Sequence, residues 1–179
     1  MKPINKIILS ISILLLAQPS FAAHHEAGEK HEKIVIGHEH SSTGAKLNIY
    51  GGDLATVDIW GAYITAHNTR DLDAIHKANA DDFMGWAANG IIVNGPAAHA
   101  AFLKEWFAAS SPKWKMKYAI ANEVADEDGG VQQWVTSAYT VTDTIDGKEV
   151  ASEEIYDVRI ENGKVKNIYV AARAVIPAE

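Results

Sequence analysis

Cysteine is absent from this 179-residue chain, and its absence excludes several possibilities at once. No disulfide can cross-link the fold, so stability has to come from packing alone. No thiol is present to act as a nucleophile. A bacterial lipid-modified N-terminus, which is built on a cysteine, is excluded as well.

Long apolar runs are also scarce, and the one that stands out lies near the N-terminus. Residues 7–17 are apolar apart from two serines, which is about half of the ~20 residues that span a bilayer. Two lysines precede this run, and the small residues Ser20 and Ala22 follow it. The pattern predicts a signal peptide over residues 1–22, cleaved after Ala22, and hence a periplasmic or secreted protein.

Positive charge is in deficit, with 16 lysines and arginines against 23 acidic residues and a net charge of −7. An acidic balance argues against nucleic acid and anionic membranes as partners. The sequence also has no Gly-x-Ser-x-Gly nucleophile motif and no glycine-rich phosphate-binding loop. No cofactor is therefore expected.

Histidine, by contrast, is concentrated in residues 23–46, which we expect to form a flexible leader in which residues 34–36 could add a strand. Five of the eight histidines lie there, interleaved with glutamates: His24, His25, His31, His38 and His40. Imidazole and carboxylate suit zinc, copper or nickel. Nothing in the sequence fixes these ligands, so weak metal affinity and specific metal handling both stay open.

The remainder, residues 47–179, reads as one folded domain that begins with helices and ends with strands. Asp53 is a candidate helix cap, Pro96 a candidate first helical residue, and Asn89-Gly90 a hairpin turn. Hydrophobic periodicity predicts helices over 54–68, 71–80 and 96–109, a hairpin from 83–87 and 91–93, and strands over 114–124, 131–142, 150–161 and 165–176. This order predicts an α+β fold.

Three stretches, residues 63–73, 80–102 and 156–165, resemble the nuclear transport factor two superfamily, and within it the SnoaL-like and ketosteroid isomerase-like domains. The resemblance implies a curved antiparallel sheet that forms a cone, covered by three N-terminal helices. It also implies a mostly apolar cavity that takes a small molecule. Homodimers through the outer sheet face are common in such families. Trp86 and Met84 alternate with Phe83 and Ala87 on their strand, so we expect Trp86 at such an interface.

Ketosteroid isomerases combine a helix tyrosine, a carboxylate base and a carboxylic acid that donates to the developing oxyanion. The resemblance places Tyr63 at the tyrosine, but Ala87 at the base, and alanine cannot accept a proton. Tyr156 falls at the oxyanion acid, whereas a shift by one residue would place Asp157 there. Steroid isomerase activity is therefore expected to be negligible.

The remaining site candidates come from local periodicity. His67 follows Tyr63 by one helical turn and could transfer a proton, or could simply pack at the helix end. Strict alternation places Trp114, Met116 and Tyr118 on one strand face, toward the cavity. These residues predict an apolar pocket with two phenol donors, Tyr63 and Tyr156, and no ionised base.

Three functions remain open at this point. The first is an exported domain that binds a small, partly apolar or carbonyl-containing molecule. The second is a lyase or isomerase of the ketosteroid isomerase type that uses Tyr63, Tyr156 and His67. The third is metal handling through the leader histidines.

Overall fold

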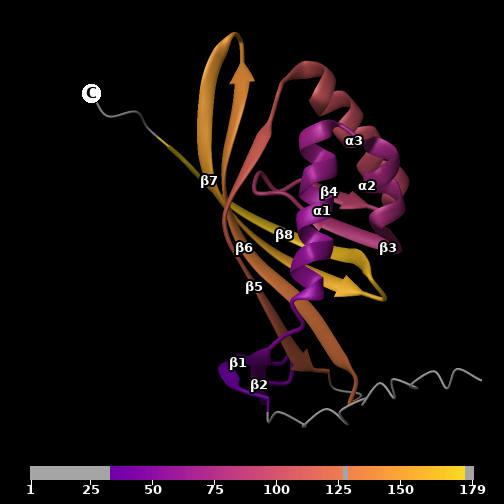
Figure 1. Cartoon of the computed structure of the whole chain (residues 1–179), viewed down its shortest axis with the longest axis vertical. Coiled ribbons are helices and arrows are strands. Elements are labelled where there is room, and N and C mark those ends of the chain that lie inside the picture. Colours follow the sequence, from indigo (N-terminus) through magenta and orange to yellow (C-terminus); the bar gives the residue numbers. More distant parts are fainter. Residues whose placement is uncertain (1–32, 127–128, 176–179) are drawn as a thin grey trace, which may run out of the picture. The chain divides into compact units, whose positions relative to one another are not determined.

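The computed structural model describes residues 33–126 and 129–175, and these residues form three helices and one eight-stranded sheet (Figure 1). The elements in chain order are β1 (Val35–His40), β2 (Lys46–Gly51), α1 (Ala55–Thr69), α2 (Leu72–Ala78), β3 (Asn79–Trp86), β4 (Ile92–Asn94), α3 (Pro96–Ala109), β5 (Lys113–Ala125), β6 (Val131–Ile145), β7 (Lys148–Glu161) and β8 (Lys164–Ala174). None of the described helices is long and apolar enough to cross a membrane. The α+β class is confirmed, although strands β1 to β4 precede or separate the expected N-terminal helices.

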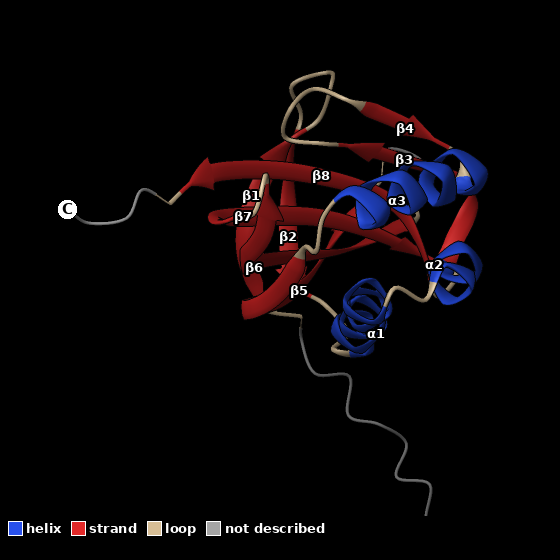
Figure 2. Cartoon of the chain, turned by 90° about the horizontal axis from the view of Figure 1, so that it is seen from above, coloured by secondary structure: helices blue, strands red, loops and turns tan. Residues whose placement is uncertain are grey.

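The sheet is curved, open and mostly antiparallel, with the strand order β1-β2-β5-β6-β7-β8-β3-β4. The long strands β5 to β8 form a meander, and β8 pairs in parallel with β3, which brings the first hairpin beside the last strand. The three helices lie on one side of this sheet (Figure 2).

Local signals in the sequence set the helix boundaries. Asp71 caps α2 by accepting a hydrogen bond from the backbone N–H of Ala74 at 2.9 Å. Pro96 occupies the first turn of α3, where its missing N–H removes no helical bond. Helix α1 begins at Ala55, one residue later than expected, and its N-cap is Leu54 rather than Asp53, although the Asp53 carboxylate accepts from the N–H of Ala55 at 2.9 Å.

The core lies between the sheet and the helices. Trp60 on α1, Phe83 on β3, Leu103 on α3 and Val158 on β7 are all exposed by 1% or less. Burial of side chains of this size supplies most of the folding free energy. Packing of these four side chains therefore fixes α1, β3, α3 and β7 relative to one another.

Strand β5 departs from the strict alternation expected of it. Its pairing with β6 shifts between Met116 and Tyr118, which is a β-bulge. Beyond the bulge, Tyr118 lies on the outer face and is 46% exposed, whereas Ala121 is only 7% exposed. The prediction that one face of this strand is apolar along its whole length is therefore wrong from the bulge onward. The extra residue in the bulge exchanges the two faces of the strand.

The described part of the expected leader, from Lys33, is ordered as strands. β1 pairs with β2, and β2 pairs with β5, so these residues extend the sheet at its edge. Lys33 also forms an ion pair with the carboxylate of Glu123, whose residue is 8% exposed. These strands are held by backbone hydrogen bonds rather than by many buried apolar side chains. Amino-acid composition does not report backbone pairing, so composition alone suggested a leader.

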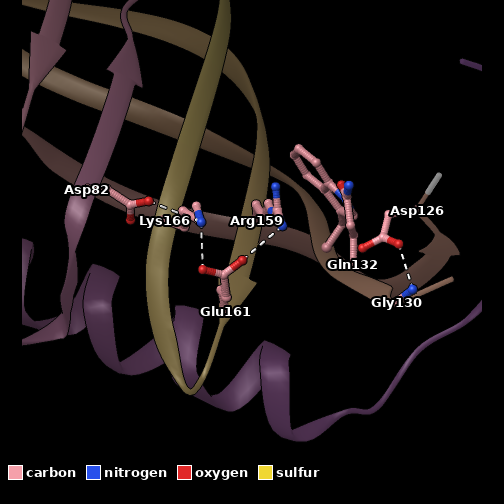
Figure 3. Close-up of polar contacts among 8 residues, drawn as sticks. Asp82, Asp126, Gly130, Gln132, Arg159, Glu161 and Lys166 are labelled. Carbon is pink, nitrogen blue, oxygen red and sulfur yellow. Dashed lines mark hydrogen bonds and ion pairs between the residues drawn. The ribbon is translucent and has the colours of Figure 1, made fainter. Parts of the chain in front are cut away.

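An ion-pair chain links the strands where β3 meets β8 (Figure 3). The Lys166 ammonium lies 3.1 Å from the Asp82 carboxylate and 2.6 Å from that of Glu161. Glu161 also accepts from the Arg159 guanidinium at 2.8 Å. Asp81 and Asp82 lie on β3. Helix α2 ends at Ala78, whereas the sequence pattern predicted that it would extend to residue 80.

Candidate functional site

A cavity of about 660 Å³ lies between the sheet and helices α1 and α3. Phe83, Gly85 and Trp86 line it from β3, and Ala87 lines it directly after that strand. The exposed lining residues mark its mouth, which lies between the β3–β4 turn, the C-terminal half of α3 and the β6–β7 hairpin. The volume suits a small organic molecule.

One polar group consists of Tyr63 and His99, which line the cavity, and of Asn79, which is hydrogen-bonded to Tyr63 and lies close to His99. The Tyr63 hydroxyl donates to Asn79 Oδ1 at 2.7 Å, and the Asn79 amide Nδ2 lies 3.1 Å from His99 Nδ1. Tyr63 and Asn79 are exposed by only 2% and 1%. Burial raises the pKa of the Tyr63 phenol well above its usual value. Tyr63 is therefore a neutral group whose proton is already used inside the protein.

His67 lies one turn after Tyr63 on the same face of α1. Its Nδ1 lies 2.8 Å from the backbone carbonyl oxygen of Tyr63, to which it donates. Burial lowers the pKa of His67 to about 4 and that of His99 to about 3. The two rings lie 5.7 Å apart between centroids. Both imidazoles are therefore neutral at physiological pH.

A second polar group lies on β5 and β7. The Trp114 indole N–H donates to the Tyr156 hydroxyl at 2.7 Å, and that hydroxyl donates to the carboxylate of Glu154. The Ser152 hydroxyl donates to the other carboxylate oxygen at 2.7 Å. Burial, and then the negative charge of Glu154, raise the pKa of Tyr156. The result is a carboxylate held by two hydroxyl donors inside a mostly apolar wall.

The structure brings together five of the residues singled out in the sequence and separates three. Tyr63, His67, Ala87, Trp114 and Tyr156 all line the cavity. Met116, Tyr118 and Asp157 do not line it. Asp157 is exposed on the outer face, where its carboxylate accepts from the Thr136 hydroxyl at 2.9 Å. Tyr156 therefore faces the cavity and Asp157 does not, which settles the register left open by the sequence.

The expectation that no carboxylate faces the cavity is wrong, because Glu154 lines it. A usable signal existed, since Glu154 precedes Tyr156 by two residues on one strand and so shares its face. His99, which is only 7% exposed, also lines the cavity and was not among the residues singled out in the sequence. No local pattern distinguished His99 from the exposed His76, because only tertiary packing covers it.

The leader histidines give no assembled metal site within the described residues. His38 and His40 are exposed on β1, and His24, His25 and His31 lie outside the described residues. Among residues 33–126 and 129–175, no group of three or more histidine, aspartate or glutamate side chains is placed to hold a metal. Specific metal handling stays a prediction.

The arrangement can bind and polarise a small molecule by hydrogen bonding. The imidazoles offer neutral donor and acceptor atoms, and Glu154 offers a carboxylate that could receive a proton. Apolar rings surround these groups, including Trp60, Phe83 and Trp114. Hydrogen bonds made in such surroundings are stronger than in water.

Several solved structures are similar to this chain. An LEH-like epoxide hydrolase from M. tuberculosis aligns with a TM-score of 0.56 at 16% identity, covering 66% of this chain and 83% of its own. Bal32a, from a soil-derived mobile gene cassette, aligns with a TM-score of 0.55 at 13% identity over 66% and 88% of the two chains. A protein with a ketosteroid isomerase-like fold from Catenulispora acidiphila, in complex with trimethylamine, aligns with a TM-score of 0.52 at 16% identity over 63% and 82%.

At these identities the likeness shows the fold alone. No curated protein matches the chain significantly. The model of the SnoaL-like domain family, however, matches residues 60–168, which contain Trp60, His67, His99, Glu154 and Tyr156. The chain therefore belongs to the SnoaL-like domains of the nuclear transport factor two-like superfamily.

Proposed function

We propose that this domain binds a small, mostly apolar molecule that carries a carbonyl or hydroxyl oxygen. The binding site is the cavity between the sheet and the helices, which corresponds to the inside of the cone implied by the family. The observation that carries the proposal is the cavity itself, whose walls are mostly apolar and carry two polar groups, one at His67 and His99 and one at Glu154 and Tyr156. Walls of this kind select apolar ligands, and a few fixed polar atoms orient them.

We also propose that the protein carries out this function outside the cytoplasm. The signal-peptide pattern over residues 1–22 supports it.

A matched pair of variants on β8 tests the binding site. Val170 lines the cavity, whereas its neighbour Ala171 is exposed and lies on the opposite face of the strand. Val170→Trp should fill the cavity and abolish binding of 1-tetralone, measured by titration calorimetry. Ala171→Trp should leave binding unchanged. Equal binding by both variants, with folding confirmed by circular dichroism, would place the site elsewhere.

A second candidate function is proton transfer on a carbonyl compound, as in a lyase or isomerase. The position of Glu154 favours it, because a carboxylate in an apolar cavity can remove a proton from carbon beside a carbonyl group. Tyr156 donates to that carboxylate and would orient it. Tyr63 then serves to position His99 and Asn79 rather than to contact the substrate.

Deuterium exchange separates catalysis from simple binding. NMR should show exchange of the protons next to the carbonyl of 1-tetralone in D₂O, faster with the protein than without it. Glu154→Gln should remove the acceleration. Glu153→Gln is the control, because Glu153 lies on the opposite face and pairs with Lys117. If the wild type gives no acceleration while 1-tetralone still binds, the domain is a binding module for this ligand.

We also propose a homodimer through the outer sheet face. Tyr118, Ala138, Ile155 and Ala171 are cross-strand neighbours that form an apolar row across β5 to β8. Tyr118 and Ile155 are 46% and 50% exposed. Trp86 borders the cavity and also stacks on the exposed Tyr169, with ring centroids 4.3 Å apart. Exposed apolar surface of this kind is typical of a protein interface.

A further inference from the structure

Each imidazole on the cavity wall uses one nitrogen inside the protein and leaves the other free for a ligand. The hydrogen bonds that the His67 and His99 rings make in the described chain all involve Nδ1. The proton positions follow from the partners of these nitrogens.

His67 carries its proton on Nδ1. A carbonyl oxygen can only accept a hydrogen bond, so the 2.8 Å contact with the Tyr63 carbonyl requires an N–H on the histidine side. Because the ring is neutral, Nε2 of His67 then has a lone pair and acts as an acceptor.

His99 carries its proton on the other nitrogen. The Tyr63 hydroxyl has one proton and donates it to Asn79 Oδ1 at 2.7 Å, so Asn79 Nδ2 faces His99 Nδ1 at 3.1 Å. An amide nitrogen can only donate, and Nδ1 of His99 must accept. Turning the Asn79 amide round would point N–H groups at the Tyr63 oxygen and leave the Tyr63 proton without its acceptor. Nε2 of His99 is therefore protonated and acts as a donor.

Both Nε2 atoms are open to the cavity. In the described part of the chain, the buried side-chain nitrogen and oxygen atoms that lack a hydrogen-bond partner are the Tyr139 hydroxyl and Arg159 Nε. Neither imidazole Nε2 is among them, and neither has a hydrogen-bond partner among the described residues. Both atoms must therefore contact open space, and both residues line the cavity.

We propose that His67 and His99 form an acceptor–donor pair that selects an uncharged ligand with a hydroxyl or N–H group beside a carbonyl group. The ligand donor binds Nε2 of His67, and its carbonyl oxygen accepts from Nε2 of His99. The assignment rests on the proposed function, since it takes this cavity as the ligand site. Asn79 and Tyr63 are positioning residues, because they hold His99 in the donor form.

The charges around the cavity disfavour an anionic ligand. The charged lining residues among those described are Glu105, Asp143 and Glu154, and no described lysine or arginine lines the cavity. A ligand carboxylate would be repelled by these groups and would lose its hydration without gaining a cation. An α-hydroxy ketone or a lactam fits better than a carboxylic acid.

The proton positions can be measured without any ligand. Long-range ¹H–¹⁵N correlation spectra of the full-length, ¹⁵N-histidine-labelled protein at pH 7 should show His67 protonated on Nδ1 and His99 on Nε2. His76, which is exposed on α2, gives the reference pattern of a solvated ring. The same tautomer in both buried rings, or a charged ring, would overturn the proposal.

Ligand preference gives an independent test by titration calorimetry with three probes of one skeleton. 2-Hydroxy-1-tetralone has both groups, 1-tetralone lacks the hydroxyl, and 2-tetralol lacks the carbonyl. The hydroxy ketone should bind about five- to tenfold more tightly than either, since one hydrogen bond is worth about that factor. His99→Phe should weaken both ketones by a similar factor and leave 2-tetralol unchanged.

The outcomes separate this inference from the function on which it rests. Equal binding of the three probes, lost in Val170→Trp, would keep the binding function and refute the pairing of His67 with His99. Binding of none of them would refute both. Because Phe83 stacks on His99 with centroids 4.7 Å apart, phenylalanine should pack at position 99. If His99→Phe unfolds, the NMR spectra of the wild type and its relative affinities for the three probes still test the proposal.

Discussion

Lowering the pH from 7 to 5 should destabilise this domain through two buried histidines. In the unfolded chain both rings titrate near pH 6.5, whereas in the folded protein the pKa values of His67 and His99 are about 4 and about 3. Between pH 6.5 and 4 the unfolded state therefore binds protons that the folded state does not. Stability is retained above pH 6.5 and lost as the pH falls below it.

The magnitude follows from the width of that window. Each histidine costs about 1.4 kcal/mol per pH unit below 6.5, or about 2 kcal/mol at pH 5. Both together should lower the free energy of unfolding by about 4 kcal/mol, a large share of the 5–15 kcal/mol typical of a domain. The comparison stops at pH 5 because most carboxylates titrate below it.

Urea unfolding followed by tryptophan fluorescence at the two pH values measures this effect. His99→Phe should reduce the loss between pH 7 and 5 by about half, whatever its stability at pH 7. His76→Gln, at an exposed position, should leave the loss unchanged. An equal free energy of unfolding at pH 7 and pH 5 in the wild type would refute the inference that His67 and His99 are buried and neutral in the folded protein.

Four further outcomes are expected. Leu103→Ala, at a position 1% exposed, should lower the free energy of unfolding by about 2–5 kcal/mol in urea titrations. Trp86→Glu should convert a dimer to a monomer in light scattering, and an unchanged mass would count against the outer-face interface. N-terminal sequencing of the exported protein should begin after Ala22, and a retained Met1 would exclude cleavage. Zinc should bind weakly in calorimetry and chelators should leave the melting temperature unchanged, whereas a lower melting temperature would indicate a structural metal in the leader.

The helices and the long strands could be predicted because their signals are local. Pro96 opens α3 as expected, and α2 begins at Leu72, one residue after the start that the sequence pattern predicted. The β5 bulge could not be predicted in this way, because a bulge is set by pairing with β6.

The site was predictable where residues follow one element and unpredictable where distant elements meet. Tyr63 and His67 share a helix face, and both line the cavity. The link between Tyr63, Asn79 and His99 joins three elements that are separated in the sequence, and no local period reports it. Glu154 was not predicted, because the family resemblance implies a role only for the position of Tyr156, although the strand period places both residues on one face.

A crystal structure of the full-length mature protein grown with 2-hydroxy-1-tetralone tests the central claim most directly. The account predicts the probe inside the cavity, with its carbonyl oxygen about 3 Å from His99 Nε2 and its hydroxyl oxygen about 3 Å from His67 Nε2. A probe bound elsewhere while the cavity holds only water would contradict the assignment of this cavity as the ligand site.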